Sequence, residues 1–211
     1  MPKLTVDNRE IPFNNETNLL QLILSNGIYI PNLCHLKGMK KPPVSCRLCF
    51  VEIEGYDKPV PSCAIKPEDG MIISTDTPEV RRLQKTAFRL LLSVHIITCA
   101  SCSANKRCEL QKMAKFLKVP LKQKKIELLD IKTKTEENHP FLVYDHEKCV
   151  ICGRCVYTCK KLFGSPYLSF SGRGLDTSIS FFGETDPDKI PCGDCYACTD
   201  ICPVGALLKK N

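Results

Sequence analysis

The sequence Cys149-Val150-Ile151-Cys152-Gly153-Arg154-Cys155-Val156-Tyr157-Thr158-Cys159 carries four cysteines in the spacing C-x2-C-x2-C-x3-C. The same spacing returns in Cys192-Gly193-Asp194-Cys195-Tyr196-Ala197-Cys198-Thr199-Asp200-Ile201-Cys202, which Pro203 follows. The two runs are an internal repeat of one pattern. Thiols at this spacing are typical metal ligands. The repeat therefore predicts a C-terminal module, residues 141–211, that is organised around metal.

The spacing of the repeat favours iron–sulfur clusters over zinc. In runs of this kind the first three cysteines bind one 4Fe–4S cluster, and the fourth binds the cluster of the other run. Zinc would use two C-x2-C pairs with a long gap between them, so paired zinc knuckles are the weaker alternative. One departure is Lys160, which stands where proline usually follows the first run. We predict two crossed ligand sets: Cys149, Cys152, Cys155 and Cys202 for one 4Fe–4S cluster, and Cys192, Cys195, Cys198 and Cys159 for the other.

The N-terminal module, residues 1–76, holds a second pattern, Cys34-x11-Cys46-x2-Cys49-x13-Cys63. We expect strands over residues 3–6, 11–13, 50–54, 59–64 and 71–74, and a helix over residues 19–24 that Thr17 caps and Gly27 ends. Two strands, a helix, a cysteine-bearing loop and further strands are the element order of a β-grasp sheet. Four cysteines on such a scaffold suit a 2Fe–2S cluster, and a structural zinc ion is the alternative.

The middle of the chain, residues 77–119, is predicted to be helical. Thr77-Pro78-Glu79 is a helix start, and a second helix is expected from Glu109 to Val119. Apolar residues recur at helical spacing behind the first start: Leu83, Ala87, Leu90, Leu91 and Val94.

The loop between these two helices contains a third pattern, His95-x3-Cys99-x2-Cys102-x5-Cys108. Three cysteines leave a 4Fe–4S cluster one ligand short, and His95 completes the set. With this histidine, the 15 cysteines of the chain supply four ligands to each of four clusters, with none left over. His35, His139 and His146 are expected to be ordinary histidines without a ligand role. His35 stands next to Cys34, so the alternative for this residue is a hydrogen bond near the 2Fe–2S cluster.

The expected fold class is α+β, with three modules and a connector. Residues 1–76 are a β-grasp 2Fe–2S ferredoxin module, residues 77–119 a small helical His/Cys cluster module, and residues 141–211 a bacterial two-cluster ferredoxin module. Residues 120–140 mix lysines with acidic residues and are expected to be a solvated connector, with a basic docking strip as the alternative. The expected cofactors are one 2Fe–2S cluster and three 4Fe–4S clusters.

Composition and charge exclude several classes of protein. The start, Met1–Asp7, lacks the apolar core of a signal peptide, and no apolar run reaches the roughly 18 residues of a membrane span. We therefore expect no transmembrane segment. Because exposed iron–sulfur clusters need a reducing compartment, we expect the protein to be cytoplasmic. The formal charge of +7 suggests nucleic acid as a partner. Clusters with their thiolates contribute roughly −7, however, so the loaded protein is near neutral and that interpretation fails.

Nucleotide-binding motifs are also missing from the sequence. No G-x-G-x-x-G or P-loop motif occurs, and Gly172-Arg173-Gly174 is expected to be a turn between strands. We therefore expect no bound flavin or NAD(P), and no catalytic residues in this chain.

The four motifs in this order resemble a known family of iron–sulfur proteins. It comprises the N-terminal iron–sulfur region of the G-type subunit of complex I, the accessory domains of iron-only hydrogenases, and small subunits of NAD(P)-linked hydrogenases and formate dehydrogenases. The residues that carry the resemblance are Ile30–His35, Cys46–Gly55, His95 with Cys99 and Cys102, Cys108–Gln111 and Cys202–Leu207. A departure is Ile96-Ile97-Thr98, where many relatives carry Pro and Asp between the ligands.

The resemblance implies an electron-transfer subunit with a diaphorase role. It would relay electrons between a flavoprotein that oxidises NAD(P)H and a hydrogenase or formate dehydrogenase catalytic subunit. Because the chain ends at Asn211, it looks most like the small iron–sulfur subunit of bidirectional nickel–iron hydrogenases. The alternatives are a free-standing multi-cluster ferredoxin, which would be a stable monomer, and a zinc-based interaction or nucleic-acid module, which would be colourless.

Overall fold

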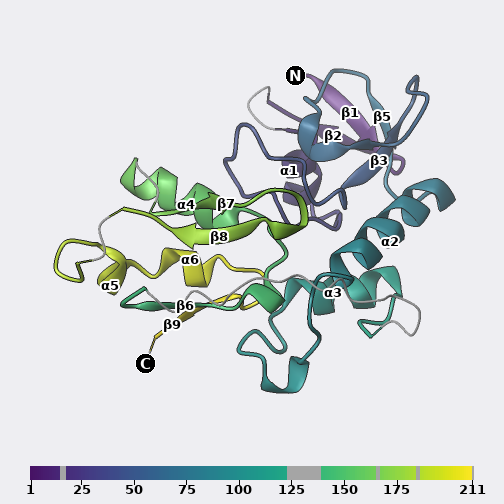
Figure 1. Ribbon diagram of the computed structural model, residues 1–211. Coiled ribbons are helices and arrows are strands. Elements are labelled where there is room, and N and C mark those ends of the chain that lie inside the picture. Colours follow the sequence, from purple (N-terminus) through teal and green to yellow (C-terminus); the bar gives the residue numbers. More distant parts are fainter. Residues whose placement is uncertain (15–17, 123–138, 165–166, 184–185, 211) are drawn as a thin grey trace. The chain divides into compact units, whose positions relative to one another are not determined.

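The computed structural model describes residues 1–14, 18–122, 139–164, 167–183 and 186–210 (Figure 1). The chain divides into two compact units, Met1–Leu90 and Leu91–Asn211. Thr17 and most of the predicted connector lie outside the described residues. The finer division into four segments stays a prediction.

The first unit is built on a mixed five-stranded sheet in the order β2-β1-β5-β3-β4. The strands are β1 (Lys3–Val6), β2 (Arg9–Pro12), β3 (Phe50–Ile53), β4 (Val60–Pro61) and β5 (Ile72–Ser74). Only β1 and β5 run parallel among these neighbours, so the first and last strands lie side by side at the centre. Asp7 and Asn8, with φ of 49° and 67°, make the tight turn between β1 and β2.

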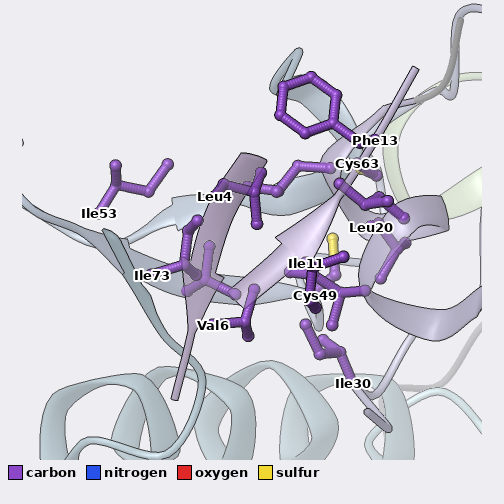
Figure 2. Close-up of a cluster of buried hydrophobic side chains, with 14 residues drawn as sticks. Leu4, Val6, Ile11, Phe13, Leu20, Ile30, Cys49, Ile53, Cys63 and Ile73 are labelled. Carbon is purple, nitrogen blue, oxygen red and sulfur yellow. The ribbon is translucent and has the colours of Figure 1, made fainter. Parts of the chain in front are cut away.

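Helix α1 (Leu19–Ser25) supplies the other half of the first core. Its buried residues pack with alternate residues of the strands, and Figure 2 shows Leu4, Ile11 and Leu20 in one cluster with Cys49 and Cys63. Asn18 is the N-cap, and its side chain accepts a hydrogen bond of 2.9 Å from the Gln21 N–H. Gly27, at φ 79°, follows the helix end as predicted.

One strand prediction in this unit was too long. β4 ends at Pro61, and Ser62–Ala64 form a 3-10 turn instead of continuing to residue 64. The Ser62 N–H and the Ser62 hydroxyl both donate to the Cys49 carbonyl, at 2.9 and 2.8 Å. This pair of bonds ends the strand and fixes the buried Cys63 in the same core as Cys49.

Helix α2 (Pro78–Leu92) begins where predicted, with the Val80 N–H donating to Thr77 Oγ1 at 3.2 Å. The apolar residues at helical spacing match its buried side only in part. Ala87 is buried, but Leu90 is 67% exposed, whereas Val80, Phe88 and Leu92 are buried. Gln84 is buried too, and its side-chain amide donates to the Phe50 carbonyl of β3 at 3.2 Å, so the buried side of the helix includes a polar residue.

The second unit combines short helices with two antiparallel strand pairs, β6–β9 and β7–β8. Its elements are η2 (Cys99–Ser101), α3 (Glu109–Leu117), β6 (Leu142–Tyr144), η3 (His146–Lys148), α4 (Arg154–Phe163), β7 (Leu168–Ser171), η4 (Gly174–Asp176), β8 (Ser178–Phe181), α5 (Cys192–Cys195), α6 (Ala197–Asp200) and β9 (Leu207–Lys209). Helices α4 and α6, which each carry cysteines of one run, pack against each other. As predicted, Gly172-Arg173-Gly174 turns between two strands.

Candidate metal centres

The four cysteines of the first unit converge in its core. Cys34, Cys46, Cys49 and Cys63 are all buried. The Sγ atoms of Cys34 and Cys46 lie 3.4 Å apart, and Cys49 and Cys63 belong to the same cluster of buried side chains. The thiols of Cys46 and Cys63 hold the pKa of Cys34 well below its usual range, while the contact with Cys34 raises the pKa of Cys46. The structure therefore brings the predicted 2Fe–2S ligand set together.

The crossed sets of the repeat surround two separate cavities in the second unit. One cavity, of about 330 Å³ including its open side, is lined by Cys149, Cys152, Cys155 and Cys202. The other, of about 330 Å³, is lined by Cys159, Cys192, Cys195 and Cys198. Each run thus sends its fourth cysteine to the cavity of the other run. We call these the Cys149 cavity and the Cys192 cavity.

The third set surrounds another cavity, of about 260 Å³, which His95, Cys99, Cys102 and Cys108 line. We call it the His95 cavity. His95 is buried, and its Nδ1 lies 2.9 Å from the Lys148 carbonyl oxygen. Because a carbonyl can only accept, Nδ1 carries the hydrogen and Nε2 of the neutral ring is left as a metal-ligating atom. Burial lowers the pKa of His95, which favours this neutral form.

The three cavities of the second unit follow one another in space. Val204 lines both the His95 cavity and the Cys149 cavity. Lys148, which receives the His95 hydrogen bond, lines the first and directly precedes Cys149, which lines the second. On the far side, α4 carries Cys155 and Cys159 to the Cys149 and Cys192 cavities. The Cys149 cavity is therefore the middle one.

The chemistry of the thiols that line these cavities fits bound 4Fe–4S clusters. Burial raises the pKa of Cys152 and of Cys198 to about 12, and that of Cys192 to about 11. Such thiols ionise near neutral pH only beside a cationic metal group, which deprotonates the thiols that bind it. Within the described ranges, no three His, Cys, Asp or Glu side chains form a group suited to one metal ion.

The remaining histidines have structural surroundings. His35 Nε2 lies 3.2 Å from the Asn18 side-chain amide, next to the cap of α1. His139 Nδ1 accepts from the Phe141 and Leu142 N–H groups at 3.2 and 3.1 Å. His146 stacks edge-on against Tyr144. Sequence reasoning missed Tyr144 and Val204, because nothing in the spacing marks a residue that reaches a site from another part of the fold.

Gly205 packs closely against Ser103 and Ala104, and its replacement by alanine is expected to destabilise the second unit. Its φ is +70°, and an added Cβ would lie 2.9 Å from Ala104 Cβ and from Ser103 Oγ. Left-handed backbone and overpacking together cost about 2–4 kcal/mol of unfolding free energy. The loss of unfolding free energy is measured by urea unfolding of the anaerobic protein, followed by far-UV circular dichroism. Gly174→Ala is the matched control, because its φ of +58° is similar but nothing lies within 4 Å of the added Cβ. Equal losses in both variants would refute the packing argument.

Comparisons with known proteins match three successive regions of the chain. A family model described as a 2Fe-2S iron-sulfur cluster binding domain matches residues 2–78. The NADH-ubiquinone oxidoreductase-G iron-sulfur binding region matches residues 84–120. The ferredoxin-like domain of NADH-quinone oxidoreductase subunit 3 matches residues 139–208.

Individual relatives extend over nearly the whole chain. The NADH-quinone oxidoreductase G 2 subunit of Rhizobium meliloti is 30% identical over 99% of this chain, and the NADPH-Fe(3+) oxidoreductase subunit alpha of Geobacter sulfurreducens is 31% identical over 100%. The chain spans 24% of the length of each. In a crystal structure of NAD+-reducing NiFe-hydrogenase in its H2-reduced state, one chain is 27% identical with a TM-score of 0.84, covering 99% of this chain and 87% of that one. No helix in the described part of the chain is long and apolar enough to cross a membrane.

Proposed function

We propose that this chain, which combines a 2Fe–2S domain, an NADH-G type 4Fe–4S region and a subunit 3 ferredoxin-like domain, is an electron-transfer subunit of an NAD(P)-linked oxidoreductase complex. The observation that carries the proposal is the row of three cavities in the second unit, each lined by four predicted ligands. Iron–sulfur clusters take up and release single electrons without breaking bonds. A row of such sites suits relay, and the chain itself performs no further chemistry in this proposal.

The proposed ligand sets are those that the spacing predicts. Cys34, Cys46, Cys49 and Cys63 hold the 2Fe–2S cluster. His95 with Cys99, Cys102 and Cys108 holds the first 4Fe–4S cluster. The crossed sets around the Cys149 and Cys192 cavities hold the other two. The hydrogen bond from His95 Nδ1 to the Lys148 carbonyl orients the imidazole, as outer partners of metal-binding histidines usually do.

The proposed partners are a flavin- and NAD(P)-binding subunit and a hydrogenase or formate dehydrogenase catalytic subunit. The support is the similarity to a chain of an NAD+-reducing hydrogenase, of which this chain covers 87%. Hydride chemistry requires flavin and nicotinamide, which would belong to the partner. In this proposal the chain passes electrons from the flavoprotein to the metal site of the catalytic subunit, where the substrate reacts. Electrons can also flow in the opposite direction.

The proposal predicts how much iron the native protein contains and which subunits co-purify with it. Anaerobic purification from its own cells, followed by iron analysis and mass spectrometry of every co-purifying chain, is expected to give about 14 iron atoms per chain. It is also expected to recover a flavin-binding subunit together with a catalytic subunit that contains nickel, iron or molybdenum. A brown monomer with full iron would instead identify a free ferredoxin. Zinc in place of iron would refute both interpretations.

A further inference from the structure

We infer that Tyr144 sets the reduction potential of the cluster in the Cys149 cavity, through a hydrogen bond from its hydroxyl to Cys149 Sγ. The inference rests on the proposed function, because it requires a cluster in that cavity. Tyr144 is a positioning and tuning residue here, and binds no metal itself.

The side chain of Tyr144 is buried and lines the Cys149 cavity. Tyr144 is the last residue of β6, pairs with Leu207 of β9, and is 1% exposed. Its oxygen accepts a hydrogen bond of 3.2 Å from the Ile179 N–H of β8. Tyr144 and Cys149 line the same cavity, and in the inferred bond the hydroxyl hydrogen is donated to Cys149 Sγ.

This donor distinguishes the two clusters of the repeat. Cys149 Sγ also accepts from the Ile151 N–H at 3.4 Å, and Cys159 Sγ in the other set accepts from the Tyr167 N–H at 3.3 Å. Backbone donors of this kind serve both sets. Tyr144 stands five residues before Cys149, and the corresponding residue before Cys192 is Pro187, which has no hydroxyl. The repeat is therefore asymmetric at this position.

A hydroxyl that donates to a ligand sulfur favours the reduced cluster. Reduction adds negative charge that is shared by the ligand sulfurs, and hydrogen bonds to charged acceptors are stronger than those to neutral ones. Hydrogen bonds to the sulfurs accordingly raise cluster potentials. Because the Cys149 cavity is the middle one of the row, a higher potential there gives the transferred electron a preferred position between its two neighbours.

The test is an anaerobic redox titration of the intact protein, followed by electron paramagnetic resonance, with Tyr144→Phe. Loss of the hydroxyl is expected to lower the reduction equilibrium constant of this one cluster about tenfold, which is 59 mV for one electron. The other clusters keep their potentials. Cys202→Ala and Cys159→Ala, which each remove one ligand, assign the signals of the two clusters. Tyr56→Phe is the control, because Tyr56 is 48% exposed and belongs to the first unit.

A second variant is expected to shift the reduction potential in the opposite direction. It also keeps the test possible if the clusters of Tyr144→Phe do not assemble. Site-specific incorporation of 3,5-difluorotyrosine at position 144 makes the phenol more acidic and a stronger donor, so the potential of the same cluster is expected to rise. Unchanged potentials in assembled variants, or equal shifts in all clusters, would overturn the inference. Absence of four-iron signals from the unaltered protein would instead reject the proposed function.

Discussion

Cys159→Ala is expected to remove the cluster of the Cys192 cavity and to leave intact the cluster that its sequence neighbours bind. Cys155 and Cys159 lie one helical turn apart on α4, so their thiols reach different cavities along the helix axis. Loss of one ligand from a 4Fe–4S cluster removes about four of about fourteen iron atoms per chain. Iron and sulfide analysis with electron paramagnetic resonance of the reduced protein measures the loss.

Cys202→Ala is the matched variant for this prediction. Cys202 is the fourth cysteine of the second run but lines the Cys149 cavity. Its replacement is expected to remove an equal amount of iron and the other set of signals. If each substitution instead abolished the signal of its own run, the crossed assignment would be wrong. If both removed all eight iron atoms of the pair, the two clusters would assemble as one unit.

Local spacing could predict which residues come together in the structure, because the residues of each proposed ligand set lie mostly on short stretches. Three cysteines of each run, and the whole His95 set, lie within 14 residues or fewer of one another, so the sequence order nearly determines their proximity. The strands, turn and helix of the first unit were likewise predictable, since Asp7-Asn8 and the alternation around them are local signals.

Features that depend on contacts between distant segments could not be predicted. The strand predicted to end at residue 64 stops at Pro61 because Ser62 bonds to Cys49, thirteen residues before it. The buried face of α2 includes Gln84 because the Phe50 carbonyl of β3 satisfies its amide. Tyr144 lines the Cys149 cavity, where Ile179 of β8 donates to its hydroxyl and Leu207 of β9 pairs with its backbone. In each case a polar group acquires its role from a partner that the local pattern does not contain.

His95→Ala is expected to remove the cluster of the His95 cavity, again about four iron atoms of about fourteen. Three thiols remain around that cavity, one ligand fewer than the four that the proposed cluster uses. The substitution also leaves the Lys148 carbonyl without its imidazole donor. Iron analysis and electron paramagnetic resonance report the loss, and electron relay through the assembled complex is expected to slow with it.

Two further variants separate ligation from packing. His95→Cys restores a fourth ligand but no donor to Lys148, so iron content is expected to recover. The potential of that cluster is expected to fall, because a thiolate adds a negative charge where imidazole is neutral. His139→Asn changes another buried histidine, which accepts backbone hydrogen bonds but lines none of the cysteine cavities described above, and should keep all its iron. Full iron in His95→Ala would remove this residue from the ligand set. If His95→Ala and His95→Cys both lost iron, His95 would have a packing role, because a cysteine that replaces a ligand histidine is expected to restore the iron.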